Sequence, residues 1–133
     1  MGKNYLINEG NQIGYMDASF DENLNLVNNK LVAGADIEKG QVVVVSDAFT
    51  VIPSDGTSKA VLGVAMMDVK AGEPIAVECE GLMRLTAAAT ITAPAEIEAA
   101  ANGKVKTAAE GKVIGVAISD ATADGDVIVK LSV

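Results

Sequence analysis

The chain of 133 residues contains no histidine, no tryptophan and a single cysteine, and its aromatic residues are limited to two Phe and two Tyr. A lone cysteine excludes an intrachain disulfide. Histidine is the usual base that activates a Ser or Cys nucleophile, and it is the commonest metal ligand. Its absence therefore argues against nucleophilic catalysis and against metal binding. We therefore expect no enzyme activity, no catalytic residues, no cofactor and no metal site. Cys79 ends an apolar alternation and is predicted to be a buried thiol.

Basic residues and long apolar runs are also scarce. Ten Lys and Arg stand against eighteen Asp and Glu, which gives a net charge of −8, and the basic residues are scattered singly. This pattern argues against nucleic-acid binding and favours a positively charged partner surface. No stretch approaches the roughly eighteen apolar residues of a membrane span, and the N-terminus lacks the apolar core of a secretory signal. We expect no membrane association and synthesis in the cytoplasm.

Short runs of Val, Ile, Leu and Ala, bounded by Gly, Asp and Asn, are plentiful, and one group of them occurs twice. Residues 61–81 overlay residues 113–133 without a gap at a shift of 52, and residues 35–45 overlay 89–99 at a shift of 54. The first overlay contains seven identities, which pair Val61, Gly63, Val64, Ala65, Asp68, Ala71 and Val77 with Val113, Gly115, Val116, Ala117, Asp120, Ala123 and Val129. Such runs are typical of strands, and a repeat indicates a duplicated unit. The sequence predicts a mainly β fold, a small β-sandwich or barrel of β-tulip type, with repeat units at about 31–81 and 85–133 in a single domain of residues 31–133.

Two local features need the repeat for their interpretation. Residues 93–101 (APAEIEAAA) favour a helix by propensity. However, residues 96–99 overlay the valine run 42–45, which is predicted to be a strand buried on both faces. In addition, Asn102-Gly103 is a strong hairpin signal. We predict a strand at 96–99, with a short helix over 94–101 as the alternative. Gly63 and Gly115 interrupt apolar strands at equivalent places, which indicates a bulge or a close backbone contact, most simply at a sheet-to-sheet crossing in the core.

Paired carboxylates in the repeat turns are the remaining candidates for chemistry. Aspartate is favoured in turns because its side chain caps backbone amides, so a structural role is preferred over acid–base catalysis. Residues 120–125 also resemble the start of a calcium loop, but the twelfth position, where a bidentate Glu is needed, is Leu131. The paired carboxylates of the repeat turns are Asp68 and Glu73 in the first unit and Asp120, Asp124 and Asp126 in the second.

Residues 1–30 differ from the rest, because seven of the eight Asn of the chain lie there. We interpret them as a loop-rich N-terminal arm. Its one apolar patch, Tyr5-Leu6-Ile7, is long enough for a short strand. That strand either belongs to the sheet of the domain itself or docks on a partner by strand addition.

A succession of short motifs resembles one known family. In order, they are Lys3-Asn4-Tyr5 with Glu9-Gly10, residues 37–40 before a valine strand, LGVA and IGVA, AGEPIAV, and the ending DGDVIVKLSV. Together they resemble the small capsid cement or head-decoration proteins of tailed bacteriophages, which are similar to the lambda-like head decoration proteins. The resemblance implies a homotrimer at local threefold positions on the outer surface of an expanded head, where it binds the major capsid protein and stabilises the virion against internal DNA pressure. The capsid-contacting residues that we expect on this basis are Lys3, Asn4, Tyr5, Leu6 and Ile7.

Two other functional classes stay open at this stage. Biotinyl and lipoyl carrier domains are also small, acidic, duplicated β-sandwiches, although Lys70 does not lie between two Met as a biotinyl hairpin requires. A small-molecule-binding β-clip-like module is suggested by the turn at residues 35–40.

Overall fold

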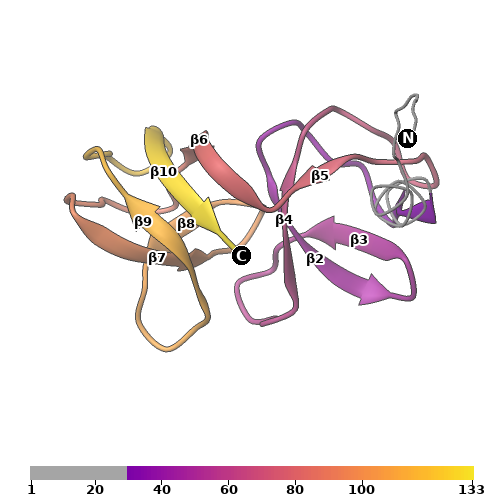
Figure 1. Ribbon diagram of the computed structural model, residues 1–133, viewed down its shortest axis with the longest axis horizontal. Coiled ribbons are helices and arrows are strands. Elements are labelled where there is room, and N and C mark those ends of the chain that lie inside the picture. The colour runs from indigo at the N-terminus through magenta and orange to yellow at the C-terminus, as the bar shows by residue number, and fades with distance from the viewer. Residues whose placement is uncertain (1–29) are drawn as a thin grey trace, which may run out of the picture. The chain divides into compact units, whose positions relative to one another are not determined.

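The computed structural model describes residues 30–133, of which Val32–Val133 form one compact unit. The strands of this unit are β1 (Val32–Ala33), β2 (Val42–Asp47), β3 (Thr50–Pro53), β4 (Val61–Ala65), β5 (Val77–Glu78), β6 (Glu80–Thr86), β7 (Ala95–Ala99), β8 (Val105–Thr107), β9 (Val113–Ala117) and β10 (Asp126–Ser132). They form two five-stranded sheets, ordered β1-β3-β2-β4-β5 and β6-β10-β9-β7-β8 (Figure 1). The mainly β fold that the sequence predicts is therefore confirmed.

The duplication is visible in the strand pairing. Without β1 and β6, the two sheets have the orders β3-β2-β4-β5 and β8-β7-β9-β10, which correspond strand for strand under the repeat. Pairs outside the strands correspond too, because Ile37 bridges Val69 and Ile91 bridges Ala121. Each sheet is thus one copy of the repeated unit with one extra strand.

Gly63 and Gly115 lie at equivalent β-bulges. Val43 pairs with Gly63 and the next pair skips Leu62, while Ile97 pairs with Gly115 and the next pair skips Ile114. A Cβ atom on Gly63 would collide with the carbonyl oxygen of Glu78, and one on Gly115 with that of Lys130. The expected bulge and close backbone contact are both present. The contact is with the neighbouring strand of the same sheet, so the expectation of a sheet-to-sheet crossing was wrong.

Strand β7 replaces the helix that its composition favours. It pairs antiparallel with β8 and with β9, and its residues Ile97, Glu98 and Ala99 are buried. The β7–β8 connection has positive φ at Asn102 (61°) and Gly103 (72°), as a type I′ hairpin turn requires. Tertiary pairing therefore overrides the helix propensity of the segment, as the repeat predicts.

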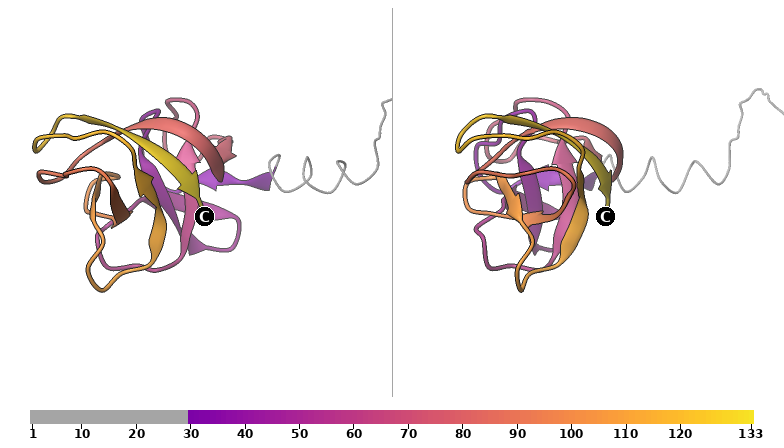
Figure 2. Two further views of the ribbon diagram at one scale, coloured as in Figure 1. Left: turned by 60° about the vertical axis from the view of Figure 1, so that its left-hand side comes forward. Right: turned by 90° about the vertical axis from the view of Figure 1, so that its left-hand side faces the viewer.

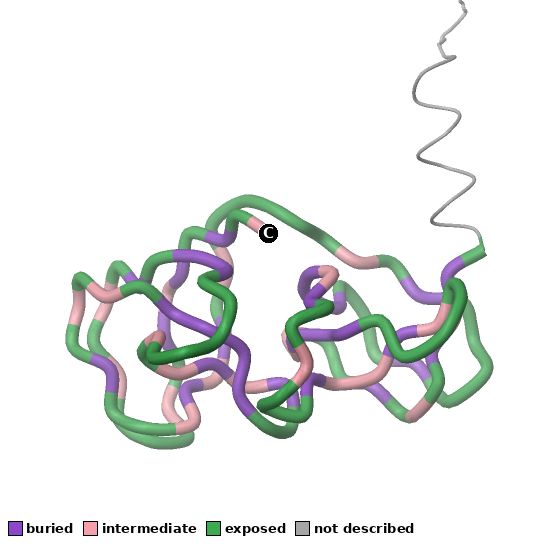
Figure 3. The backbone as a smooth tube through the Cα atoms, turned by 90° about the horizontal axis from the view of Figure 1, so that it is seen from below, coloured by how far each residue is buried: buried purple, intermediate pink, exposed green. Residues whose placement is uncertain are grey.

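The two sheets share one hydrophobic core. It combines Val42 and Val64 of the first sheet with Ile97, Val129 and Leu131 of the second. Figure 3 shows that buried residues are spread along the whole described domain. Hydrogen bonds also join the sheets directly: Val42 N–H donates to the carbonyl of Gly103 at 2.9 Å, and the Ser54 hydroxyl donates to the carbonyl of Ala100 at 2.5 Å.

The chain crosses from the first sheet to the second between β5 and β6, and here the prediction for Cys79 is wrong. The apolar alternation that ends at Cys79 forms only the short strand β5, and Cys79 is exposed rather than buried, because the alternation of faces stops where the chain leaves the first sheet. Gly81, with a φ of +120°, allows the turn of the backbone at this crossing. Beyond it, β6 and β10 pair over seven residues and curve together (Figure 2).

The valine run of β2 is buried on both faces only in part. Val42, Val43 and Val44 are buried, whereas Val45 is exposed. The strand continues to Asp47, and the turn to β3 lies at residues 48–49. Val42 and Val44 belong to the core shared with the second sheet, whereas Val43 is buried outside that cluster.

Candidate interaction surfaces

The acidic turns of the two units have the same structural role. The carboxylate of Asp68 accepts a hydrogen bond from the Lys39 N–H, and that of Asp120 accepts one from the Ala93 N–H, both at 2.8 Å. Lys39 and Ala93 are themselves equivalent under the repeat. Each carboxylate therefore fixes the same turn in its own unit, which supports the structural interpretation of these residues over acid–base catalysis.

The other carboxylates of these turns are exposed and take part in local contacts. Glu73 accepts a hydrogen bond from the Lys70 N–H at 2.7 Å. Asp124 forms an ion pair with Lys104 at 2.6 Å, and Asp126 forms one with Arg84 at 3.7 Å. Exposed pairs of this kind contribute about 0–1 kcal/mol to the free energy of unfolding.

The described structure gives no support to the calcium-loop resemblance of residues 120–125. Leu131 is buried within β10, so the segment that resembles a calcium loop continues into a strand of the sheet. In residues 30–133 no group of three or more Cys, Asp or Glu side chains is placed to hold a metal ion. Within the same range, no helix is long and apolar enough to cross a membrane.

Cys79 is a poor nucleophile in its position. Desolvation raises the pKa of the thiol, and the negative charges of Glu78 and Glu80 raise it further. The thiol donates a hydrogen bond to the carbonyl of Leu62, with 3.3 Å between sulfur and oxygen. A raised pKa leaves less thiolate at neutral pH, which lowers reactivity.

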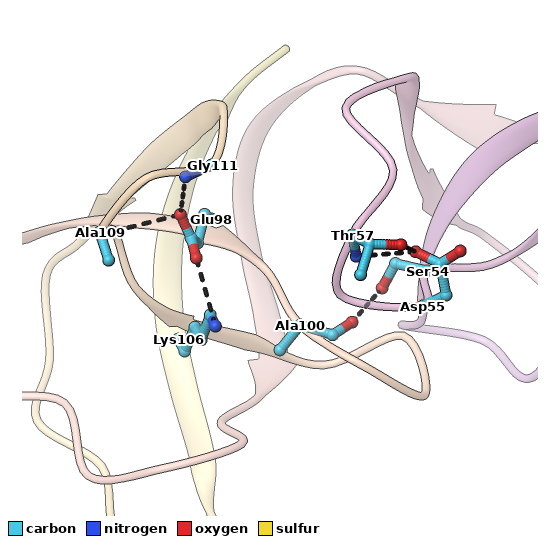
Figure 4. Close-up of polar contacts among 8 residues, drawn as sticks. All are labelled: Ser54, Asp55, Thr57, Glu98, Ala100, Lys106, Ala109 and Gly111. Atoms are coloured by element: carbon cyan, nitrogen blue, oxygen red, sulfur yellow. Dashed lines mark hydrogen bonds and ion pairs between the residues drawn. The ribbon is translucent and has the colours of Figure 1, made fainter.

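Glu98 is the one charged residue of the described chain that is buried, and it organises the loop between β8 and β9 (Figure 4). Its carboxylate accepts hydrogen bonds from the Gly111 N–H at 2.6 Å and the Ala109 N–H at 3.2 Å, and it forms an ion pair with Lys106 at 3.3 Å. These bonds offset the cost of burying the charge. The sequence analysis missed Glu98, although a carboxylate that overlays Val44 in the repeat was an available signal.

The equivalent loop of the first unit is held by a different residue. The exposed carboxylate of Asp55 accepts a hydrogen bond from the Thr57 N–H at 2.8 Å (Figure 4). It accepts another from the Ser58 N–H at 2.9 Å, and these bonds, Ser58 first, lower the pKa of Asp55. Asp55 overlays Ala109 in the repeat. Both loops thus depend on one carboxylate, but it comes from the loop in one unit and from the strand in the other.

We expect Glu98 to make stability depend on pH. The hydrogen bond from Ala109, with those from Gly111 and Lys106, lowers the pKa of Glu98 below its ordinary value of 4.5. Because the folded pKa lies below the unfolded one, the stabilisation is complete above the unfolded pKa and is lost as pH falls through the folded value. As the pH falls below this ordinary value, the free energy of unfolding should therefore fall less steeply in Glu98→Gln than in the wild type.

Urea unfolding at several pH values measures this difference. At neutral pH, Glu98→Gln should lose on the order of 1 kcal/mol, because a neutral amide replaces a charged acceptor. Glu96→Gln is the matched control, since Glu96 is exposed on the same strand. Equal pH slopes for the wild type and Glu98→Gln would contradict the role of this carboxylate.

Exposed apolar side chains gather on the outer face of the second sheet. Leu82, Lys130, Val116 and Glu96 are successive cross-strand neighbours on β6, β10, β9 and β7. Leu82 is 68% exposed, and Val116 and Ile118 are exposed as well. This face mixes apolar and charged groups, as contact surfaces between proteins do.

The sequence-predicted contact residues, Lys3, Asn4, Tyr5, Leu6 and Ile7, lie outside the described residues. The structure therefore describes the surfaces of the β-domain and does not test the predicted contacts of the arm. No residue of the apolar outer face was predicted from the sequence to be a contact residue, because an exposed strand residue is distinguished from a buried one only when the register is known.

Comparisons with known proteins agree with this architecture. The phage cement protein family matches residues 22–132 of the chain. A solved structure, the N base of the head fibre gp8.5 in bacteriophage phi29, is similar in fold with a TM-score of 0.62 and 15% sequence identity, over 77% of this chain and 90% of that chain. No curated protein matches. The chain belongs to the phage cement protein family, and it is a capsid-associated structural protein of a phage.

Proposed function

We propose that this protein is a cement protein that binds the outer surface of an expanded phage head and stabilises it against internal DNA pressure. The observation that carries the proposal is the family match, which spans almost the whole described domain. The proposed partners are the major capsid protein and two further copies of the chain, in a trimer at local threefold positions. Many weak contacts that symmetry repeats provide avidity without a deep binding site.

The structure supports a mechanical role through its construction. The core joins both sheets, and direct hydrogen bonds between the sheets supplement it. Such a domain transmits force without large internal rearrangement, because close-packed interiors have low compressibility. A rigid body that is bound at several points restrains the relative motion of the subunits beneath it.

The proposed division of labour assigns residues 1–30 to attachment and residues 31–133 to the rigid body. Lys3, Asn4, Tyr5, Leu6 and Ile7 are the proposed contacts, and strand addition to a coat-protein edge is the proposed mode. In that mode, main-chain hydrogen bonds provide affinity and alternate side chains provide specificity.

The proposal is tested by adding the purified protein to expanded heads that lack it. We expect saturable binding, three copies per local threefold position, and an increase in the temperature at which the heads release DNA. Sedimentation of the heads and densitometry of the bound protein give the stoichiometry. Absence of binding at saturating excess would refute the proposal.

Deletion of residues 2–8 tests the arm separately. The truncated protein should unfold at the same urea concentration as the full chain but bind heads at least tenfold more weakly, because the proposed strand pairing is lost. Deletion of residues 17–23 is a control that removes seven residues and keeps Lys3–Ile7 in sequence. Normal decoration of heads by the protein without residues 2–8 would show that the arm is not the attachment element.

A further inference from the structure

Strand β6 is an unusually long sheet edge for this domain. The other edge strands that the structure describes are short, with two residues in β1 and β5 and three in β8, whereas β6 has seven. Proteins usually shorten or cover their sheet edges, because unpaired backbone groups invite pairing with another chain. A long edge strand is therefore a candidate for contact with a partner.

Hydrogen bonds at both ends of β6 show which backbone groups point outward. The Val133 N–H donates to the carbonyl of Cys79 at 3.0 Å, and the Ala87 N–H donates to the carbonyl of Gly125 at 2.9 Å. Because backbone groups alternate in direction along a strand, the odd residues of β6 face β10. The N–H and C=O groups of Leu82 and Arg84 therefore face away from it, and no strand of residues 30–133 pairs with that edge.

A groove of about 420 Å³ lies along this open edge. Its walls are apolar, with Val64 and Ala65 of β4 and Met66 just after it on one side, and Leu82 and Met83 of β6 on the other. Leu82 has the largest exposed fraction of the exposed apolar side chains in the described domain. An apolar side chain that enters this groove also comes within reach of free backbone donors and acceptors.

The charge of the groove is opposite to that of the whole protein. Lys39 and Arg84 line it together with Gly40, and no carboxylate does. Arg84 has an exposed ion pair with Asp126, whereas the amino group of Lys39 has no ion-pair partner among residues 30–133. On a chain with a net charge of −8, this is a local site for a carboxylate. The second unit has Ala93 and Pro94 in the places of Lys39 and Gly40, so the cationic rim is not a product of the repeat.

We propose that this groove binds an extended peptide segment that carries an apolar side chain next to a carboxylate. The backbone of the segment bonds to Leu82 and Arg84, the apolar side chain lies between Met66 and Leu82, and the carboxylate meets Lys39 and Arg84. On the proposed function, this segment belongs to the major capsid protein. The site is distinct from the predicted arm and adds a second point of attachment.

A titration followed by NMR tests the groove without a capsid. The probes are two peptides that differ in one residue, acetyl-Thr-Val-Leu-Glu-Val-amide and acetyl-Thr-Val-Leu-Lys-Val-amide. The Glu peptide should shift the amide resonances of Leu82 and Arg84 and bind at least tenfold more tightly than the Lys peptide. The charge reversal Lys39→Glu with Arg84→Glu should remove this preference, whereas Lys59→Glu with Lys112→Glu, at exposed sites outside the groove, should retain it. Equal binding of both peptides, or no shift at β6 with either, would overturn the proposal.

Head binding then tests the identity of the partner. Leu82→Glu should weaken binding to expanded heads at least tenfold, while Val45→Glu, at an exposed apolar residue of β2 outside the groove, should not. If the wild type binds heads and Leu82→Glu binds equally well, the coat-protein assignment of the groove is wrong. If the wild type does not bind heads at all, the proposed function fails, and the peptide titration still decides whether the groove binds such a segment.

Discussion

Replacement of Gly115 by Ala is expected to destabilise the domain by about 3 kcal/mol or more, the upper part of the range for overpacked cores. The added Cβ atom would meet the carbonyl oxygen of Lys130, which is backbone in the middle of β10 and cannot rotate away as a side chain can. β10 pairs with both β6 and β9, so its displacement disturbs the whole second sheet. With a total stability of about 5–15 kcal/mol for a typical domain, a loss of this size is a large fraction.

The measurement is urea unfolding of the variant beside the wild type and a matched glycine control. Gly72→Asp is that control, because Gly72 has a φ of +89° with open space around it, and the equivalent residue Asp124 adopts a φ of +64°. We expect the control to change stability by no more than about 1 kcal/mol. A Gly115→Ala protein as stable as Gly72→Asp would show that the bulge adapts to a side chain.

The second large effect is expected from proline in β6. Met83→Pro should cost about 3 kcal/mol or more, because Met83 faces β10 and its N–H belongs to the ladder. Leu82→Pro should cost clearly less, since the N–H of Leu82 points to the open edge, where proline is tolerated. Gly81 before it has no Cβ to clash with the proline ring.

Thermal and urea unfolding of these two variants compare neighbouring positions on one strand. If Leu82→Pro were the more damaging substitution, the open edge would lie on the other side of β6. The same result would remove the backbone part of the proposed peptide site.

The repeat made most of the fold predictable. It assigned residues 96–99 to a strand against their helix propensity, because their counterparts at 42–45 are four valines. It also marked Gly63 and Gly115 as special backbone positions and Asp68 and Asp120 as turn residues. Each of these predictions rests on local chemistry that two copies of the same backbone path repeat.

Features that occur once were not predictable in this way. Strand β6 lies at the junction of the two repeat units, and its length as an edge follows from the strand order, which periodicity does not reveal. Cys79 was assigned to the interior because alternation was extended past the point where the chain changes sheets. The groove combines Lys39 and Arg84, which are far apart in sequence, so only the folded chain brings their charges together.

The burial of Glu98 has a consequence for how the chain folds. Two halves with equal strand order and equal bulges compete for the same partners, and exchange of strands between repeats is a common error of such proteins. In the register of the second unit, Glu98 pairs with Lys106, whereas the equivalent pair in the first unit is Val44 with Ile52. If β7 took the place of β2, the carboxylate would lie against Ile52, where the second unit has Lys106. The buried charge of Glu98 thus distinguishes the two halves of the duplicated chain. It raises the free energy of a fold in which their strands are exchanged.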